Sequence, residues 1–244
     1  MQKNGNDPGS MIGLLGGTFN PVHIGHLRLA ASVADALGLD RIEFVPCAVP
    51  PHKPDTDLLS FEMRVSLLQA ALENSPNNRT QFAISTLESE LEPPSYTWNL
   101  VQAWKKLHPD HPPLFILGGE DFAHMDSWYR GEELPLETNL AIVPRGTFTE
   151  QDFCSRILSK WPEASISCLN GQEDILQAAL PKQDEENAGT YCYFLPLPIL
   201  DISSSALRQS WLDGRDIRFL MPDASIALLN QYAEEIRACW EKAR

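Results

Sequence analysis

The sequence predicts an α/β fold in which a doubly wound parallel sheet is followed by a small helical C-terminal region. Short apolar runs alternate with segments of helical periodicity between residues 11 and 143, and this alternation is typical of a parallel sheet with helices on both faces. Two of the apolar runs end directly on a pair of glycines, as strands do where the chain turns sharply into a helix. From about residue 203 to 244 the patterns are helical.

A strand, a helix, a second strand and a second helix are predicted in the first third of the chain. An apolar run over residues 11–15 breaks at a glycine pair, and apolar residues then recur at helical spacing up to Gly38. A second run over residues 42–45 ends at a proline, and after a long loop Ser60 is placed to cap a helix. The apolar residues on one face of this helix are Phe61, Val65, Leu68 and Leu72.

Three further strands and a helix are predicted in the middle of the chain. The strands are expected over residues 82–87, 114–117 and 139–143, and the second of them stops at the other glycine pair. The helix is expected over residues 95–107. Its apolar stripe is expected to lie in the core and consists of Trp98, Val101 and Trp104.

The signal is weaker after residue 150. Residues 150–180 have room for a helix, a strand and another helix, and residues 181–189 are polar enough to predict a mobile loop. Residues 191–200 predict a strand only in their first half, because two prolines follow. The end of the chain predicts two helices, over residues 204–212 and 222–243.

Charge and composition exclude several classes of function. The chain has 33 acidic and 19 basic residues and a formal net charge of −14, so it lacks the positive potential that attracts nucleic acid or an anionic membrane. No apolar run approaches the roughly 20 residues of a membrane helix, and the polar residues 1–10 predict a disordered leader without a signal region. The five cysteines include no C-x-x-C pair, which indicates reduced thiols. We therefore expect a cytoplasmic protein.

The segment most informative about chemistry lies between Gly16 and His26. Two glycines directly after a strand let backbone N–H groups approach a polyanion closely, and the N-terminus of the following helix adds partial positive charge. His23 is three residues before His26, so on a helix both can donate hydrogen bonds into one site. The pattern alone also fits a tight turn with surface histidines. It fits half of a metal site less well, because the candidates for a third ligand, His52, His124 or a carboxylate, do not follow the two histidines at a spacing typical of metal sites.

Residues 16–27, G-G-T-F-N-P-V-H-I-G-H-L, resemble the first signature of the nucleotidylyltransferase superfamily, whose H-x-G-H motif contacts the triphosphate of a nucleoside triphosphate. Residues 202–208, I-S-S-S-A-L-R, are similar to its second signature, I-S-S-T-x-I-R. Hydroxyls at a helix start leave N–H groups facing outward, and an arginine one turn later adds a fixed cation. Taken alone, this second segment also fits simple N-capping followed by a solvated arginine.

Four shorter segments resemble the bacterial nicotinate-nucleotide adenylyltransferases in particular. They are P-P-H-K at 50–53, P-S-Y-T at 94–97, G-E-D at 119–121 and W-Y at 128–129. The resemblance spans roughly residues 11–232. This sequence departs from the family pattern at Glu120 and in a longer stretch between about residues 150 and 190.

The resemblance implies a single Rossmann-like nucleotidyltransferase domain over residues 11–244, and it assigns the site residues to three groups. The implied catalytic residues are His23, His26 and Arg208. The residues implied to bind ATP are Gly16, Gly17, Thr18, Phe19, Gly119, Asp121, Ser203 and Ser205, and those implied to bind the mononucleotide are Lys53, Thr97, Trp128 and Tyr129. Simpler roles stay open: Lys53 fits an ordinary loop, Trp128 the core, and Asp121 a helix cap.

The implied reaction joins ATP and nicotinate mononucleotide to give deamido-NAD and diphosphate. Mg²⁺ is expected to arrive with ATP, and the protein itself is expected to hold no metal and to bind neither nucleic acid nor membrane. The sequence leaves open whether the chain forms a homo-oligomer. Two other functions fit it less well: another adenylyl- or cytidylyltransferase, such as the pantetheine-phosphate enzyme, and a nucleotide-binding regulator without turnover.

Overall fold

The computed structural model describes residues 11–50, 57–73, 79–181 and 189–241. The predicted leader over residues 1–10 and Lys53 lie outside the described residues, as does most of the predicted mobile loop over residues 181–189.

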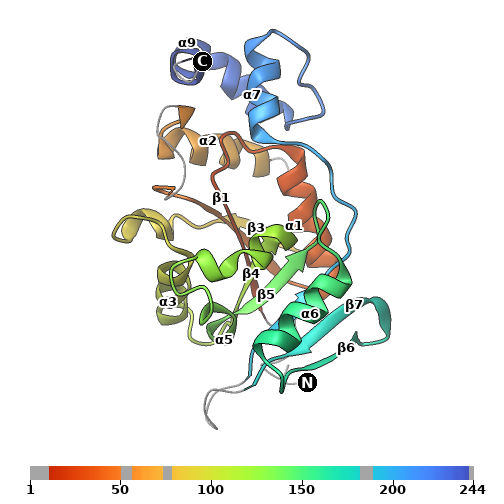
Figure 1. Cartoon of the computed structure of the whole chain (residues 1–244). Helices are drawn as coiled ribbons and strands as arrows, with labels where there is room; N and C mark the ends of the chain where they lie inside the picture. The colour runs from red at the N-terminus through yellow and green to blue at the C-terminus, as the bar shows by residue number, and fades with distance from the viewer. Residues whose placement is uncertain (1–10, 51–56, 74–78, 182–188, 242–244) are drawn as a thin grey trace.

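Within the described residues, one eight-stranded sheet, in the order β3-β2-β1-β4-β5-β8-β7-β6, forms the centre of the molecule (Figure 1). The strands from β3 to β8 in this order are parallel, and the order reverses beside β1, as in doubly wound folds that bind nucleotides at such a point. The predicted parallel sheet is therefore confirmed. The bounds are β1 Ile12–Gly17, β2 Arg41–Pro46, β3 Gln81–Ile84, β4 Pro113–Gly118, β5 Asn139–Val143, β6 Ser165–Leu169, β7 Gln172–Ala179 and β8 Tyr191–Phe194.

The last two strands of the sheet correct the expectation for residues 150–180. A helix and a strand are present there, but the second predicted helix is the strand β7, which pairs antiparallel with both β6 and β8. The turn between β6 and β7 consists of Asn170 and Gly171, with φ of 44° and 81°. An Asn-Gly pair is the residue pair most typical of a two-residue hairpin, because both positions need a positive φ.

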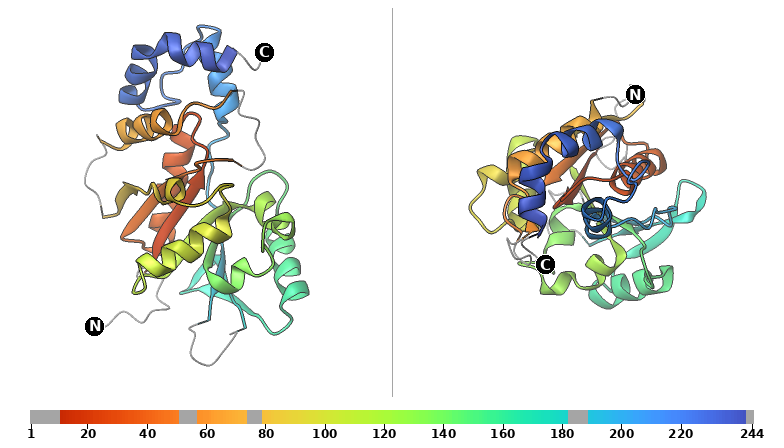
Figure 2. Two further views of the ribbon diagram at one scale, coloured as in Figure 1. Left: turned by 90° about the vertical axis from the view of Figure 1, so that its left-hand side faces the viewer. Right: turned by 90° about the horizontal axis from the view of Figure 1, so that it is seen from above.

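Helices cover both faces of the sheet (Figure 2). One hydrophobic cluster contains residues of α1, α2 and the C-terminal helices, and the other contains residues of α3 to α6. The bounds are α1 Ile24–Leu37, α2 Phe61–Leu72, α3 Thr97–Leu107, α4 Gly119–Ala123, α5 Leu134–Glu137, α6 Glu150–Lys160, α7 Ser204–Leu212, α8 Asp223–Gln231 and α9 Ala233–Trp240, with 3-10 turns η3 Leu87–Glu90 and η4 Met125–Ser127.

Several local expectations are confirmed. Gly38 ends α1 with φ of 67°, the left-handed conformation that favours glycine at a helix end. Ser60 caps α2, because its side chain accepts a hydrogen bond from the Met63 N–H. The predicted core stripe of α3 is buried. The predicted third strand is shorter than expected, since it ends at Ile84 and the chain continues into η3.

Two helices differ from the expectation in ways that matter for the site. The predicted C-terminal helix is divided at Tyr232 into α8 and α9, and this bend lets Trp240 pack edge-on against Trp211 at 5.4 Å. On the predicted apolar face of α2, only Leu68 is fully buried. The buried face instead includes Arg64, which is 1% exposed, because backbone carbonyls at the end of the sheet accept hydrogen bonds from its guanidinium.

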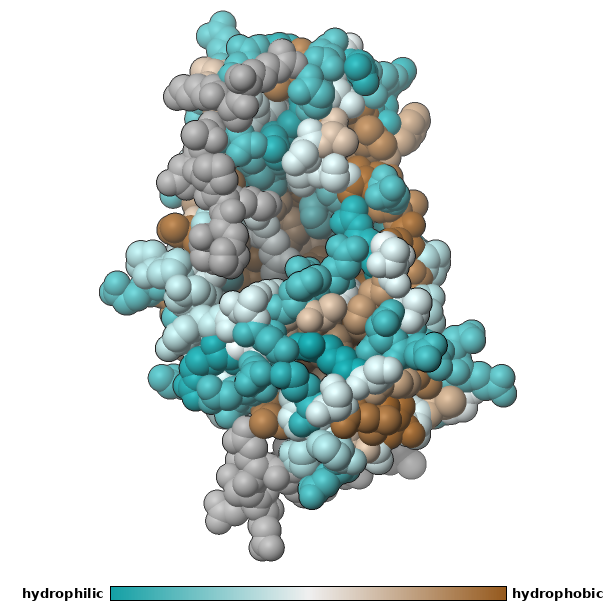
Figure 3. All heavy atoms as spheres, in the orientation of Figure 1, coloured by the Kyte–Doolittle hydropathy of each residue, from teal (hydrophilic) through white to brown (hydrophobic). Residues whose placement is uncertain are grey.

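The surface of the molecule is mainly polar on the face seen in Figure 3. Figure 3 shows a face that is mainly hydrophilic, with hydrophobic residues gathered along one edge. No helix in the described parts of the chain is long and apolar enough to cross a membrane.

Candidate active site

The chain between β1 and α1 forms the first wall of the site. A Cβ on Gly16 would lie 3.1 Å from the Phe115 ring, and one on Gly17 would lie 3.0 Å from the Phe19 ring, so close packing accounts for the lack of side chains at both positions. Phe19 itself has φ of 47°, which is uncommon for an aromatic residue. Its buried ring meets the His26 ring edge-on at 5.0 Å.

His23 and His26 lie together at the N-terminus of α1, as predicted. Their rings stack with centroids 3.7 Å apart. The His23 N–H donates to His26 Nδ1 at 3.2 Å, so in neutral His26 the ring proton is on Nε2. Burial, with a smaller contribution from the cation of Arg145, lowers the pKa of His23 to about 4.

The glycine between the two histidines leaves room for the His23 ring. A Cβ on Gly25 would come within 2.9 Å of His23 Nδ1. That nitrogen is buried and has no hydrogen-bond partner among the described residues. A buried polar atom without a partner costs free energy, so this ring is held in place at some cost to stability.

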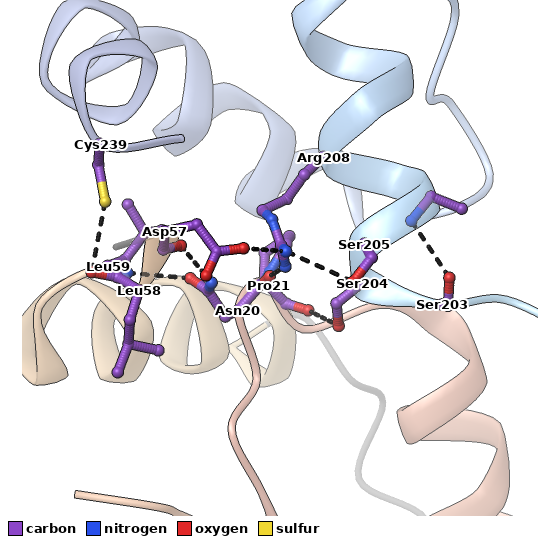
Figure 4. A network of polar contacts seen from close by, with 11 residues as sticks. Asn20, Pro21, Asp57, Leu58, Leu59, Ser203, Ser204, Ser205, Arg208 and Cys239 are labelled. Atoms are coloured by element: carbon purple, nitrogen blue, oxygen red, sulfur yellow. Dashed lines mark hydrogen bonds and ion pairs between the residues drawn. The ribbon is translucent and has the colours of Figure 1, made fainter. Parts of the chain in front are cut away.

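The second signature is brought to the first across 180 residues of sequence (Figure 4). Ser203 caps α7 by accepting a hydrogen bond from the Ala206 N–H at 3.2 Å, so the simple capping role is present. Ser204 Oγ donates to the Pro21 carbonyl at 2.9 Å. Arg208 Nη1 donates to the Asn20 carbonyl at 2.8 Å. The start of α7 therefore lies directly against the loop that precedes the histidines.

Arg208 is not a solvated helix residue. Its side chain is 16% exposed and forms an ion pair with Asp57, and its Nη2 also lies 3.4 Å from Ser205 Oγ. Asn20 holds the same segment, because its Nδ2 donates to the Asp57 carbonyl at 2.7 Å and its Oδ1 accepts from the Leu59 N–H at 3.1 Å. The cation expected to meet a triphosphate is thus already paired with a carboxylate.

On the β4 side, the structure supports the simpler role for Asp121. Gly118 is the N-cap of α4, and the Asp121 carboxylate accepts a hydrogen bond from the Gly118 backbone N–H. Burial raises the pKa of this carboxyl. A Cβ on Gly119 would lie 2.4 Å from the Phe148 ring, so this glycine permits close packing. Binding of ATP by either residue stays a prediction.

The residues expected to bind the mononucleotide come from two segments that meet. Thr97 is the first residue of α3, and the Tyr96 ring before it stacks on the Tyr129 ring at 4.8 Å. Tyr129 is 52% exposed, whereas Trp128 is half-buried against the second hydrophobic cluster. One side of Trp128 therefore packs against the core, and its other side is partly exposed.

The loop after β2 joins this region to the glycine turn. The Cys47 N–H donates to the Gly17 carbonyl at 2.8 Å, and the Val49 N–H donates to Ser95 Oγ at 3.0 Å. The carboxyl ends of β1 and β2 and the start of α3 thus form one continuous edge.

Sequence reasoning missed four polar residues of this edge: Asn20, Asp57, Arg64 and Arg145. Asn20 lies inside the first signature, and Arg145 follows a parallel strand at its carboxyl end, so both carried a signal. Asp57 and Arg64 carried none, because their roles depend on contacts with distant loops.

No group of three or more His, Cys, Asp or Glu side chains that could hold a metal ion gathers within the described residues. The alternative in which His23 and His26 form half of a metal site therefore gains no support from a third ligand there.

Comparisons with known proteins identify the family. Residues 14–210 match the family model described as Cytidylyltransferase-like. A protein of Geobacter metallireducens named probable nicotinate-nucleotide adenylyltransferase is 34% identical over 211 residues, which cover 86% of this chain and 91% of that protein. A protein of the same name from Lactiplantibacillus plantarum is 31% identical over 92% of this chain and 88% of its own length.

The fold is shared with solved structures of the same kind. The nicotinic acid mononucleotide adenylyltransferase of Plasmodium falciparum, complexed with NaAD, superposes with a TM-score of 0.66 at 24% identity, over 91% of this chain and 95% of that chain. A second structure of that enzyme, complexed with APC, gives a TM-score of 0.63. From the family model, the curated relatives and the shared fold together, this chain belongs to the cytidylyltransferase-like family and, within it, to the nicotinate-nucleotide adenylyltransferases.

Proposed function

We propose that this protein transfers AMP from ATP to nicotinate mononucleotide, giving deamido-NAD and diphosphate. The observation that carries the proposal is the meeting of the two signatures, where Arg208 bonds to the Asn20 carbonyl close to the stacked His23 and His26. The names of the curated relatives supply the substrates, and the arrangement of donors is suited to a polyphosphate.

The chemistry needs little from the protein beyond placement and charge. An oxygen of the mononucleotide phosphate attacks the α-phosphorus of ATP, and the bond from that phosphorus to the leaving diphosphate breaks. A phosphate monoester loses its second proton with a pKa of about 6, so the nucleophile is already ionised at neutral pH and no general base is required. Catalysis then depends on aligning two anions and stabilising the charge that develops on the diphosphate.

The residues of the first and second signatures divide this work. His26 offers its Nε2–H, since its Nδ1 accepts from the backbone. His23 is neutral at pH 7, because its pKa is about 4. Arg208 and Ser205 supply a guanidinium and a hydroxyl from α7, and backbone N–H groups of Gly17 to Phe19 complete the set. Oriented donors in such a site stabilise developing negative charge strongly.

Arg208 has to exchange partners during this cycle. Its guanidinium is bound to the Asp57 carboxylate in the structure, and a triphosphate carries more charge than one carboxylate. ATP binding therefore replaces the ion pair to Asp57 by bonds to phosphate oxygens. This exchange makes ATP affinity depend on Asp57 as well as on Arg208.

The mononucleotide is proposed to bind between the start of α3 and the segment after η4. Thr97, Trp128 and Tyr129 lie there, and an indole ring is suited to stack on a pyridine ring. Lys53, outside the described residues, is proposed to meet the mononucleotide phosphate. Mg²⁺ enters as part of the substrate, carried chiefly by the ATP phosphates.

A substrate panel tests the proposal. The purified protein is assayed for diphosphate release with MgATP and, separately, with nicotinate mononucleotide, nicotinamide mononucleotide and phosphopantetheine. We expect release with nicotinate mononucleotide, and a kcat/KM at least about 100-fold lower with the nicotinamide compound, because a site of N–H donors pairs with a carboxylate and opposes an amide NH₂. Preference for phosphopantetheine, or ATP binding without release in any mixture, would refute it.

A further inference from the structure

Arg64 of α2 is a buried cation that binds backbone rather than a carboxylate. Its side chain is among the largest fully buried ones in the described chain and is 1% exposed. The acceptors of its guanidinium are four carbonyl oxygens: Leu59 for Nε at 3.1 Å, Thr18 and Cys47 for Nη1 at 2.8 Å and 2.7 Å, and Ala48 for Nη2 at 3.4 Å. Four of its five N–H groups are thereby used.

These carbonyls belong to two different segments of the proposed site, the turn after β1 and the loop after β2. Thr18 lies in the turn after β1, on the side proposed for ATP. Cys47 and Ala48 begin the loop after β2, and Leu59 ends it. One planar group thus holds the ATP turn and both ends of the neighbouring loop.

The same loop is fixed on its other side to the region proposed for the mononucleotide. The Ala48 N–H donates to Glu88 Oε2 at 3.2 Å, so Ala48 is held through both its N–H and its carbonyl. The next residue, Val49, exchanges hydrogen bonds with Ser95, just before α3. The chain of contacts from Thr18 through Arg64 and Ala48 to Ser95 therefore links the two substrate sides.

Arg64 pairs with four backbone carbonyls, and its planar guanidinium also fixes where those carbonyls lie. Burying a cation costs free energy that hydrogen bonds to neutral carbonyls only partly offset, and burial lowers the pKa of Arg64. Leu67 and Leu68 are buried on the same face of α2, but an apolar side chain at position 64 would leave the four carbonyls without this donor. What arginine adds is a rigid planar fork that fixes several acceptors relative to one another.

We propose that Arg64 is a positioning residue that sets the distance between the turn after β1, which is proposed to bind ATP, and the start of α3, which is proposed to bind the mononucleotide. This inference rests on the proposed function, because it concerns the alignment of those two substrates. A misplacement of about 1 Å between reacting groups can lower a rate about 100-fold. Arg64 touches neither substrate in this account and acts through the backbone that binds them.

The test compares Arg64→Lys and Arg64→Met with the wild type and with a matched control. Lysine keeps the charge but offers its N–H groups from a single atom, whereas methionine keeps the apolar volume and loses every donor. The control is Arg156→Lys on α6, where a half-buried arginine binds Asp126 at 2.7 Å and packs on the Phe122 ring. Calorimetry gives the number of ATP sites per chain and the Kd of each substrate alone, and steady-state kinetics gives kcat per site.

In Arg64→Lys we expect one ATP site per chain, a Kd for each single substrate within about fivefold of the wild type, and kcat per site lower by about 30-fold or more. Arg64→Met should lose more, and Arg156→Lys should keep kcat within about twofold. A merely structural role predicts fewer sites with an unchanged kcat per site, and that result would overturn the proposal. Failure of both Arg64 variants to fold would overturn it too, whereas an inactive wild type would refute the proposed function instead.

Discussion

The pH dependence of stability should report on the buried imidazole of His23. Its pKa is lowered from 6.5 to about 4, mainly by burial and secondly by Arg145. Between pH 6.5 and 4, the unfolded chain therefore binds a proton at His23 that the folded chain does not. The contribution of this residue to stability is fully present above pH 6.5 and is lost as the pH falls to 4. One pKa unit corresponds to about 1.4 kcal/mol, so the loss from this group is at most about 3 to 4 kcal/mol, of which about 3 kcal/mol has occurred at pH 4.

Urea unfolding at pH 7 and pH 4 of the wild type and of His23→Asn measures this loss. Other titrating groups are shared by both proteins and cancel in the comparison. The free energy of unfolding of the wild type should fall by up to about 3 kcal/mol more than that of the variant. His124→Asn, at an exposed position after α4, serves as the control and should follow the wild type. An equal fall in the wild type and in His23→Asn would refute the assignment of a buried neutral imidazole.

Three substitutions test single contacts of the site. Gly25→Ala places a Cβ 2.9 Å from His23 Nδ1, so kcat/KM should fall by about tenfold or more while the melting temperature stays within a few degrees, because alanine favours the helix; unchanged kinetics would contradict the contact. Asp57→Asn frees Arg208 from its carboxylate, so the KM for ATP should fall by about threefold or more, and a higher KM would show that Asp57 instead orients the arginine. Trp128→Ala should raise the KM for nicotinate mononucleotide by about tenfold with little change in the KM for ATP, as expected for loss of one stacking ring, and equal changes for both substrates would place the pyridine ring elsewhere.

The parallel part of the fold could be predicted because each element carries its own local signal. The strands β1, β2, β4 and β5 are apolar runs, and glycines or a proline mark where most of them end. The strand β7 was missed because its buried residues, Ile175, Leu176 and Ala178, are compatible with a short helix. The Asn170-Gly171 turn was the local signal that distinguishes the two.

The geometry of the candidate site could be predicted where one short segment carries the polar residues, and not where distant segments meet. The two histidines lie in one continuous signature and Arg208 in another, and the structure brings the two signatures together. The partner of Arg208 could not be predicted, because Asp57 reaches it across about 150 residues of sequence. Arg64 was equally hidden, because helical spacing places it beside Leu68 but a charged side chain is expected to be exposed, and only the tertiary fold supplies its carbonyl acceptors.

The path of the α-phosphate of ATP tests the central claim most directly. The protein is incubated with nicotinate mononucleotide and with ATP labelled at either the α- or the γ-phosphorus, and the products are separated. Adenylyl transfer at the edge formed by Gly17, His26 and Arg208 predicts that all α-label enters deamido-NAD in amounts equal to the diphosphate released, and that all γ-label stays in diphosphate. Appearance of γ-label in a nucleotide product, or of α-label only in free AMP, would contradict it.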